Sequence, residues 1–169
     1  MMRQYLAAIF VVISLLLPQI SAQAADTLFS SLQADFILVE KGARRLTLYS
    51  GDTALRTYDI SLGTKPSGPK VRKGDRRTPE GVYYIDGRNP WSRYHRSLHI
   101  SYPDKDDIEK ARKLGKHPGG NIMIHGTGKK YARVHKDYDW TTGCIAVTDN
   151  EIDEIWAMVP EGAKIEIRP

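Results

Sequence analysis

Short runs of apolar or alternating residues, separated by turns rich in glycine and proline, constrain this chain most strongly. Seven such runs occur, at residues 35–40, 44–50, 54–62, 82–86, 94–102, 121–125 and 163–167. Runs of this length and pattern are typical of β-strands. Tight turns join the first three, which predicts a meander of antiparallel strands, and a further turn is expected at residues 88–91.

Two segments carry the signals of a helix. In residues 104–114, Asp104 can cap the first turn and Gly115 can end the last, and the thin apolar content predicts a surface helix. The second helix is predicted to start at a capping box formed by Thr148 and Glu151. Its buried face is expected to consist of residues at i, i+3, i+4 and i+7, namely Ile152, Ile155, Trp156 and Val159.

These elements together predict the fold class. A chain of 169 residues, 41% hydrophobic and 27% charged, has the composition of one globular domain. No internal repeat or linker divides it. We therefore expect a single mostly-β domain with one or two helices and a β-sandwich or barrel-like architecture.

The amino-terminal residues differ from the rest and predict a secretory signal peptide over residues 1–24. Arg3 is the only charge before Asp26, and residues 5–17 form an apolar run of thirteen residues. This run is too short for an ordinary membrane span of about 20 residues. Pro18 ends it, and the small-x-small sequence Ala22-Gln23-Ala24 offers a cleavage site.

Cleavage after residue 24 would leave a connector at residues 25–34 and a domain at 35–169. The mature protein is then exported and keeps no stable membrane span; the alternative is a segment retained as an anchor.

The net charge of +5 favours anionic partners, but it does not choose among nucleic acid, lipid and an acidic polymer. A basic, glycine-rich loop at 63–81 lacks the GxxxxGKS or GxxxxGKT spacing of a nucleotide site. We expect a surface loop or the border of a substrate groove, and no nucleic-acid partner.

Cys144 is the only cysteine in the sequence. Oxidising compartments favour paired cysteines, and this exported chain offers no intramolecular partner. A single cysteine therefore indicates intermolecular pairing or a reactive thiol, whereas a buried inert cysteine is the alternative.

His125 ends an apolar run nineteen residues before Cys144 and is the candidate base for the thiol. A free thiol has a pKa of about 8.5 and an imidazole about 6.5, so the ring can accept the thiol proton. The helix expected to start at Thr148 would favour a thiolate, and Gly143 suits an oxyanion hole of main-chain N–H groups. The carbonyl of Gly126 is the expected partner that orients the imidazole. A zinc site of His117, His125, His135 and Cys144 is a weaker alternative, because the spacings match no zinc pattern.

The sequence resembles the L,D-transpeptidase catalytic domain (YkuD-like). The similarity rests on His125-Gly126 followed after a short interval by Thr141-Thr142-Gly143-Cys144. It extends to the segment Gly74-Asp75-Arg76-Arg77-Thr78-Pro79-Glu80-Gly81 and to Ser101-Tyr102-Pro103. Together these stretches cover nearly the whole expected domain.

The resemblance implies a peptidoglycan acyltransferase without a metal or organic cofactor. Cys144 would attack the diamino-acid carbonyl of a stem tetrapeptide, with His125 as base, and release D-alanine. The acceptor would be an amine of a second stem (a 3-3 cross-link), a D-amino acid or a lysine of an envelope lipoprotein. The implied protein is periplasmic and takes part in cell-wall organisation and cell shape. Oxyanion or orienting groups are expected on the main chain of Gly143, Thr142 and Gly126, and the groove candidates are Thr141, Thr127, Tyr102 and Arg133.

Two departures from the family pattern concern substrate selection. Thr142 stands where many members have His, and Ala146 stands where many have an Arg that can pair with a substrate carboxylate. Arg76, Arg133 or Lys136 are candidates to replace that Arg. The departures keep two alternatives open. One is the same thioester chemistry with water as acceptor, as in a carboxypeptidase or an amidase that releases wall-attached protein. The other is an inactive wall-binding module.

Overall fold

The computed structural model describes residues 33–133, 135 and 137–169, so the expected signal peptide and most of the connector lie outside the described residues. The strands are β1 (Phe36–Glu40), β2 (Arg45–Ser50), β3 (Thr53–Asp59), β4 (Gly81–Ser92), β5 (His95–Ile100), β6 (Met123–His125), β7 (Ile145–Ala146) and β8 (Lys164–Arg168). The helices are α2 (Lys105–Lys113), α3 (Gly128–Tyr131) and α4 (Asp149–Met158). Among the described residues, no helix has the length and apolar content needed to cross a bilayer.

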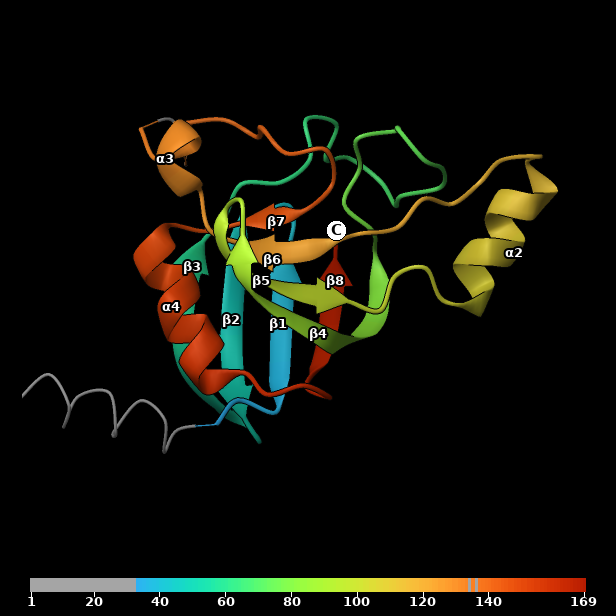
Figure 1. The fold of residues 1–169 in the computed structure, drawn as a ribbon. Helices are drawn as coiled ribbons and strands as arrows, with labels where there is room; N and C mark the ends of the chain where they lie inside the picture. Colours follow the sequence, from blue (N-terminus) through green and yellow to red (C-terminus); the bar gives the residue numbers. More distant parts are fainter. Residues whose placement is uncertain (1–32, 134, 136) are drawn as a thin grey trace, which may run out of the picture.

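The eight strands form one curled sheet in the order β3-β2-β1-β8-β4-β5-β6-β7 (Figure 1). The pairs β1–β2 and β2–β3 are antiparallel, which confirms the predicted meander. β8 then pairs in parallel with β1 and antiparallel with β4. The strand nearest the carboxyl end therefore completes the middle of the sheet.

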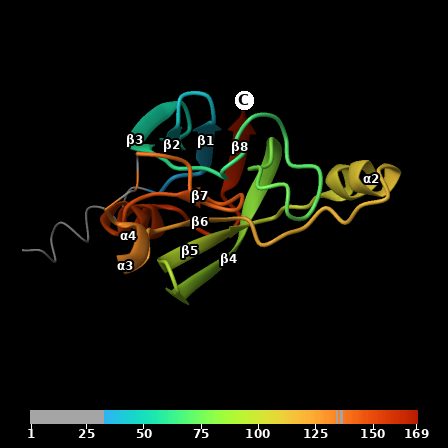
Figure 2. The same ribbon diagram turned by 90° about the horizontal axis from the view of Figure 1, so that it is seen from above.

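The two edges of the sheet approach each other. The segment that follows β3 bridges to β7 through Ser61 and Ala146, whose backbone groups exchange hydrogen bonds of 3.0 and 2.8 Å. A second bridge joins Gly63 to Thr141. These bridges curl the sheet toward a barrel, as the view along a second axis shows (Figure 2). The mostly-β, barrel-like prediction is thereby confirmed.

β4 is longer than the sequence predicted. The turn expected at residues 88–91 is wrong, because these residues continue the strand, and Arg88 and Asn89 pair with β5. Two register shifts, between Ile85 and Gly87 and between Asn89 and Ser92, mark β-bulges. Bulges bend a strand and absorb residues that would otherwise break it, including a proline. This bend lets β4 pair with β8 at one end and with β5 at the other.

Both predicted helices are present with their expected caps. Asp104 caps α2 and Thr148 caps α4, each in a complete capping box. Ile152 and Ile155 of α4 and its C-cap Val159 are buried, while Trp156 is only partly buried against the core. Figures 1 and 2 both place α2 at one end of the sheet, away from α3 and α4. The short elements α3 and β7 were not predicted.

One continuous apolar cluster fills the space between the curled sheet and α4. Its largest fully buried side chains are Ile37, Leu46, Leu48, Leu62, Ile85, Leu98, Ile100, Ile124, Ile145, Ile152, Ile155 and Met158. Burial of each such side chain contributes about 1.5–3 kcal/mol. The cluster includes the neighbours of the two functional candidates, Ile124 beside His125 and Ile145 beside Cys144, and so fixes both backbones.

Candidate active site

Strand pairing brings His125 and Cys144 to the same region. β6 and β7 are parallel, with Ile124 opposite Ile145 and His125 opposite Ala146. Side chains alternate along a strand, so Cys144, two residues before Ala146, falls on the same face as His125. Although nineteen residues separate them in sequence, the two residues thus lie diagonally opposite each other across the β6–β7 pair.

The Cys144 thiol makes its hydrogen bond away from the imidazole. The thiol is partly buried, and its Sγ donates to the carbonyl oxygen of Asn121 over 3.5 Å. Asn121 adopts a left-handed backbone with φ of 55°, a conformation that asparagine tolerates better than most residues. Among the described residues, no hydrogen bond joins Cys144 to His125. The thiol must therefore turn before it can transfer a proton to the ring.

The orientation of the His125 ring is fixed by its own neighbour. Nδ1 lies 2.6 Å from the carbonyl oxygen of Gly126, the partner expected from the sequence. A carbonyl oxygen can only accept, so Nδ1 carries the hydrogen. In the neutral ring, Nε2 is then the atom with a free lone pair. The ring is therefore set up to accept a proton at Nε2.

Gly126 occupies a position with no room for a side chain. A Cβ there would lie 2.5 Å from Asp149 Oδ1 and 2.8 Å from the carbonyl oxygen of Tyr94. Asp149, at the start of α4, accepts hydrogen bonds from Thr127 Oγ1 at 3.2 Å and from the Gly128 amide at 2.9 Å. The amino-terminal turn of α4 therefore anchors the segment that follows His125.

An aromatic cluster of Tyr94, Tyr131 and Trp140 covers His125. Tyr94 stacks on the imidazole with ring centres 4.6 Å apart, and Trp140 meets it edge-on at 5.7 Å. Tyr131 stacks on Trp140 at 3.9 Å. His125 is accordingly only 3% exposed. No local signal in the sequence predicts this cluster, because its members come from the turn between β4 and β5, from α3 and from the segment before β7.

Burial drives the two candidate groups toward their neutral forms. It lowers the pKa of the His125 imidazole below its ordinary value and raises the pKa of the Cys144 thiol. A backbone hydrogen bond from Met123 and the charge of Lys70 act in the opposite direction on the thiol pKa but are outweighed. The expectation that a helix start would favour a thiolate is wrong. β7 separates Cys144 from α4, and the start of that helix is occupied by other partners.

Thr141 holds the turn that carries Cys144. Its Oγ1 donates to the Cys144 carbonyl oxygen at 2.8 Å and accepts from the Gly143 amide at 3.1 Å. The Gly143 N–H, an expected oxyanion donor, is therefore occupied, which leaves the amides of Thr142 and Cys144 as candidates. Gly143 has φ of +136°, and a Cβ there would lie 2.7 Å from the Arg77 carbonyl oxygen. Only glycine allows this close approach.

The loop at residues 63–81 packs against this turn and is itself tightly held. Asp75 accepts from Lys70 Nζ at 2.7 Å and from the amides of Val71, Arg72 and Arg77. Burial alone would raise the Asp75 pKa, but these donors outweigh it and lower the pKa. The glycine-rich loop is therefore an ordered wall of the site.

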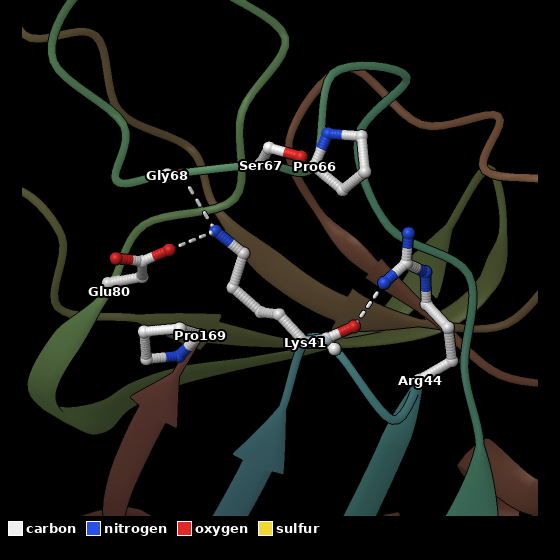
Figure 3. A pocket seen from close by; sticks show the side chains of 8 residues that line it. Lys41, Arg44, Pro66, Ser67, Gly68, Glu80 and Pro169 are labelled. Atoms are coloured by element: carbon white, nitrogen blue, oxygen red, sulfur yellow. Dashed lines mark hydrogen bonds and ion pairs between the residues drawn. The ribbon is translucent and has the colours of Figure 1, made fainter.

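Lys41 forms hydrogen bonds to the other side of the same loop. Its buried Nζ donates to the Gly68 carbonyl oxygen and to Glu80 Oε1, both at 2.8 Å (Figure 3). It also donates to the Thr78 carbonyl oxygen at 3.0 Å. Burial lowers the pKa of this ammonium group. All three N–H groups of the Lys41 ammonium thus have a partner within the protein. Lys41, which lines the pocket drawn in Figure 3, therefore has a structural role.

A separate groove of about 390 Å³ opens at Cys144. Its described lining consists of Lys70, Lys73, Gly74, His117, Gly119, Gly120, Asn121, Ile122, Thr142 and Cys144. The lining carries cationic and polar side chains and no acidic one. Its lining includes Asn121 and Ile122, which directly precede β6, whereas the aromatic cluster contacts His125 at the end of β6.

Some of the other predicted groove residues are buried and others are exposed. Tyr102 is buried and donates to the Pro118 carbonyl oxygen at 3.1 Å, so it supports the groove wall from behind. Thr127 is also buried, whereas Arg133 is exposed and lines none of the described part of the groove. Lys136 lies outside the described residues. Within those residues, no three metal-ligating side chains converge.

Comparison with known proteins places this chain in a known class. The family model of the L,D-transpeptidase catalytic domain (YkuD) matches residues 34–167. The chain therefore belongs to the L,D-transpeptidase catalytic domain family.

The curated relatives are larger proteins. The chain is 32% identical over 130 residues to YafK of Escherichia coli strain K12, whose assignment as an L,D-transpeptidase is itself provisional. The match covers 73% of this chain and 46% of YafK. The YafK of E. coli O157:H7 gives the same values. The chain thus spans about half the length of the curated relatives it matches.

Solved structures show the same fold at low sequence identity. Pgp2 from Campylobacter jejuni, described as a helical cell shape determining protein, aligns with a TM-score of 0.62 at 21% identity, over 85% of this chain and 56% of Pgp2. Bd1075 of Bdellovibrio bacteriovorus aligns at 0.56 and 23%, over 81% and 48%. An L,D-transpeptidase from Mycobacterium smegmatis aligns at 0.55 and 14%, over 80% and 59%.

Proposed function

We propose that this protein is a cysteine acyltransferase that acts on peptidoglycan stem peptides. The observation that carries the proposal is the His125 ring, held at Nδ1 by Gly126 O, with Nε2 free on the face it shares with Cys144. Family membership supports the substrate class. The roles of the individual residues are part of the proposal.

The proposed reaction starts from a neutral thiol and a neutral imidazole. The Cys144 thiol turns from Asn121 toward His125, and Nε2 takes the proton as sulfur attacks the diamino-acid carbonyl. The amides of Thr142 and Cys144 stabilise the oxyanion. His125 then returns the proton to the departing D-alanine nitrogen, and a thioester remains on Cys144.

The acceptor of the acyl group defines the activity. We propose an amine, from a second stem, a D-amino acid or an envelope lipoprotein lysine. Water is the alternative, which would make the protein a carboxypeptidase or an amidase. This alternative has one specific observation in its favour. Ala146 is fully buried where many family members carry an arginine, so this position supplies no cation to orient a substrate.

The proposal places the protein in the periplasm or cell envelope, with a role in cell-wall organisation and cell shape. Its support is the usual location of the family's substrate and the expected signal peptide. Pgp2, which shares the fold, is described as a cell shape determining protein. A fluorescent fusion with and without residues 1–24 tests the location, and envelope fluorescence that is independent of those residues would contradict the export signal.

Mass spectrometry of the products tests the proposed reaction. The protein is incubated with purified stem tetrapeptides, with and without an added D-amino acid. Exchanged or cross-linked products identify an amine acceptor, and tripeptides alone identify water. Cys144→Ala should abolish both outcomes and the thioester adduct on the intact protein. Full activity of that variant would overturn the assignment of the nucleophile, and no product of either kind would leave the binding-module alternative.

A further inference from the structure

We infer that Lys73 binds a carboxylate of the substrate in the groove beside Cys144, an assignment that rests on the proposed function. It supplies the charge recognition that a buried Ala146 cannot. The groove places Lys73, Thr142 and Cys144 along one cavity of about 390 Å³. A ligand that reaches the thiol from this side therefore passes the Lys73 ammonium group.

The two lysines of the groove differ in their availability. Lys70 is 6% exposed, pairs with Asp75 Oδ1 at 2.7 Å and also donates to the Arg72 carbonyl oxygen. Its charge is therefore neutralised within the protein. Lys73 is exposed and has no ion pair among the residues that the structure describes. The uncompensated positive charge of the groove thus belongs to Lys73.

The backbone of Lys73 is held in place by the opposite wall. Its amide donates to the His117 carbonyl oxygen at 2.7 Å. Gly119 packs so closely that a Cβ would lie 3.3 Å from both the Lys73 Cα and the Lys70 Cε. The two walls, residues 70–74 and 117–120, therefore support each other. A lysine on such a rigid backbone loses less freedom on binding than one on a flexible loop.

The local charge and polarity select the ligand chemistry. The described lining contains no acidic side chain, and its hydrogen-bond donors include Lys73 and the Thr142 hydroxyl. A carboxylate gains a charge-assisted hydrogen bond here, whereas a carboxamide gains only a neutral one. The two residues joined by the bond that is broken each offer one carboxylate, the one at the peptide terminus and the second one of the diamino acid.

The test compares acid and amide forms of one peptide. Four synthetic tetrapeptides carry either carboxylate free or amidated, and kcat/KM is measured from release of the terminal residue. The wild-type protein should prefer the acid by about tenfold at the recognised position. Lys73→Gln should lower kcat/KM for that acid by about tenfold and leave the amide unchanged. The position whose amidation removes the effect of Lys73→Gln identifies the carboxylate.

Arg72→Gln is the matched control, because Arg72 is exposed on the same loop but lines a different surface pocket. It should keep the wild-type acid preference. An unchanged preference in Lys73→Gln, or an equal loss for acid and amide, would overturn the inference.

A binding arm separates this inference from the proposed reaction. Dissociation constants of the four peptides are measured by calorimetry on Cys144→Ala, with and without Lys73→Gln. Acid preference that disappears with Lys73→Gln supports the inference even if the wild-type protein turns over no peptide, in which case the proposed function alone fails. Equal affinity of acid and amide for Cys144→Ala overturns the inference while leaving the reaction intact.

Discussion

The two sides of Cys144 are built from opposite kinds of residue. On the His125 side, the stacked rings of Tyr94, Trp140 and Tyr131 enclose the imidazole. On the groove side, lysines and glycines line an open cavity. Cys144 directly precedes β7 and is part of the groove lining. In the proposed mechanism, the aromatic side keeps the base neutral and the groove side presents charge to the substrate.

This division has a physical reason. A ring that must stay neutral to accept a proton benefits from a low-dielectric cover, because burial disfavours its charged form. A cation that binds a carboxylate must remain solvated and charged until the ligand arrives. The two requirements conflict within one pocket, and here the cover lies at the end of β6 whereas the groove lining includes the residues before its start. Substitutions on the two sides should therefore change different measured quantities.

Removal of the proposed base should have the largest effect. His125→Gln is expected to lower kcat by about 10²- to 10⁴-fold, the usual contribution of a general base. Peptide affinity, measured by calorimetry on the Cys144→Ala background, should change less than twofold. His99→Gln, on the neighbouring strand, is the control. A large loss of peptide affinity with unchanged kcat would contradict the claim that the His125 side acts on the reaction and the groove side acts on binding.

Asp75→Asn should have the next largest effect, on stability. Loss of the carboxylate leaves Lys70 buried without its charged partner, which costs about 3–5 kcal/mol for buried pairs. Because the Asp75 pKa is lowered in the folded protein, this contribution is complete above about pH 4 and declines as the pH falls further. Urea unfolding of the wild-type protein and of Asp75→Asn, at pH 7 and below pH 4, measures the loss of stability and its dependence on pH.

Asp106→Asn provides the control for that experiment. Asp106 is exposed in the first turn of α2, where a carboxylate contributes less than about 1 kcal/mol. An Asp75→Asn variant as stable as Asp106→Asn at pH 7 would show that the loop is not held by its buried ion pair.

Tyr94→Leu should produce a smaller effect on the His125 side. Loss of the stacked ring is expected to lower kcat/KM by up to about tenfold, the range of one aromatic pair. It also uncovers the imidazole, so the pKa of His125 should rise toward about 6.5. The proposed reaction requires the neutral ring, so the acidic limb of the pH profile should move to higher pH. Tyr94→Phe should keep the wild-type profile, and an unshifted Tyr94→Leu profile would contradict the role of the cover.

The smallest expected effect concerns the resting thiol. Because burial raises the Cys144 pKa, its alkylation by iodoacetamide should reach half-maximal rate above pH 8.5, the ordinary value of a free thiol. Glutathione serves as the reference under the same conditions. Fast labelling of Cys144 at pH 6 to 7 would instead show a thiolate and a preformed ion pair.

Local signals in the sequence predicted the local features of the fold. The capping residues Asp104 and Thr148 act within one helical turn, so both helix starts were predictable. The meander was predictable from its tight turns. β4 was truncated in the prediction because its bulges depend on pairing with two different strands. β7 has only two residues and exists because β6 and the segment after β3 lie beside it.

The candidate site also combines local features that the sequence predicts with non-local features that it does not. His125, Cys144 and the Gly126 carbonyl could be proposed because they lie within recognisable stretches. The aromatic cover could not, since Tyr94 and Trp140 meet His125 only after β5 and β6 have paired. The occupied Gly143 amide follows from the Thr141 hydroxyl, a side-chain choice that spacing does not reveal. The sign of the Cys144 pKa shift was missed because burial is a property of the assembled fold.

The position of β8 in the middle of the sheet also has a consequence for folding. Phe36 in β1 pairs with Lys164 in β8, so the central strands meet only after about 130 intervening residues have been synthesised. Such non-local pairing slows folding, because the entropy of closing the chain is lost before the contacts form. A nascent chain that ends just after Cys144 contains both His125 and the thiol but lacks β8, the strand that joins β1 to β4. The proposed reactive centre should therefore assemble late, after β8 has docked, and limited proteolysis of truncated chains should find the site residues unprotected until β8 is present.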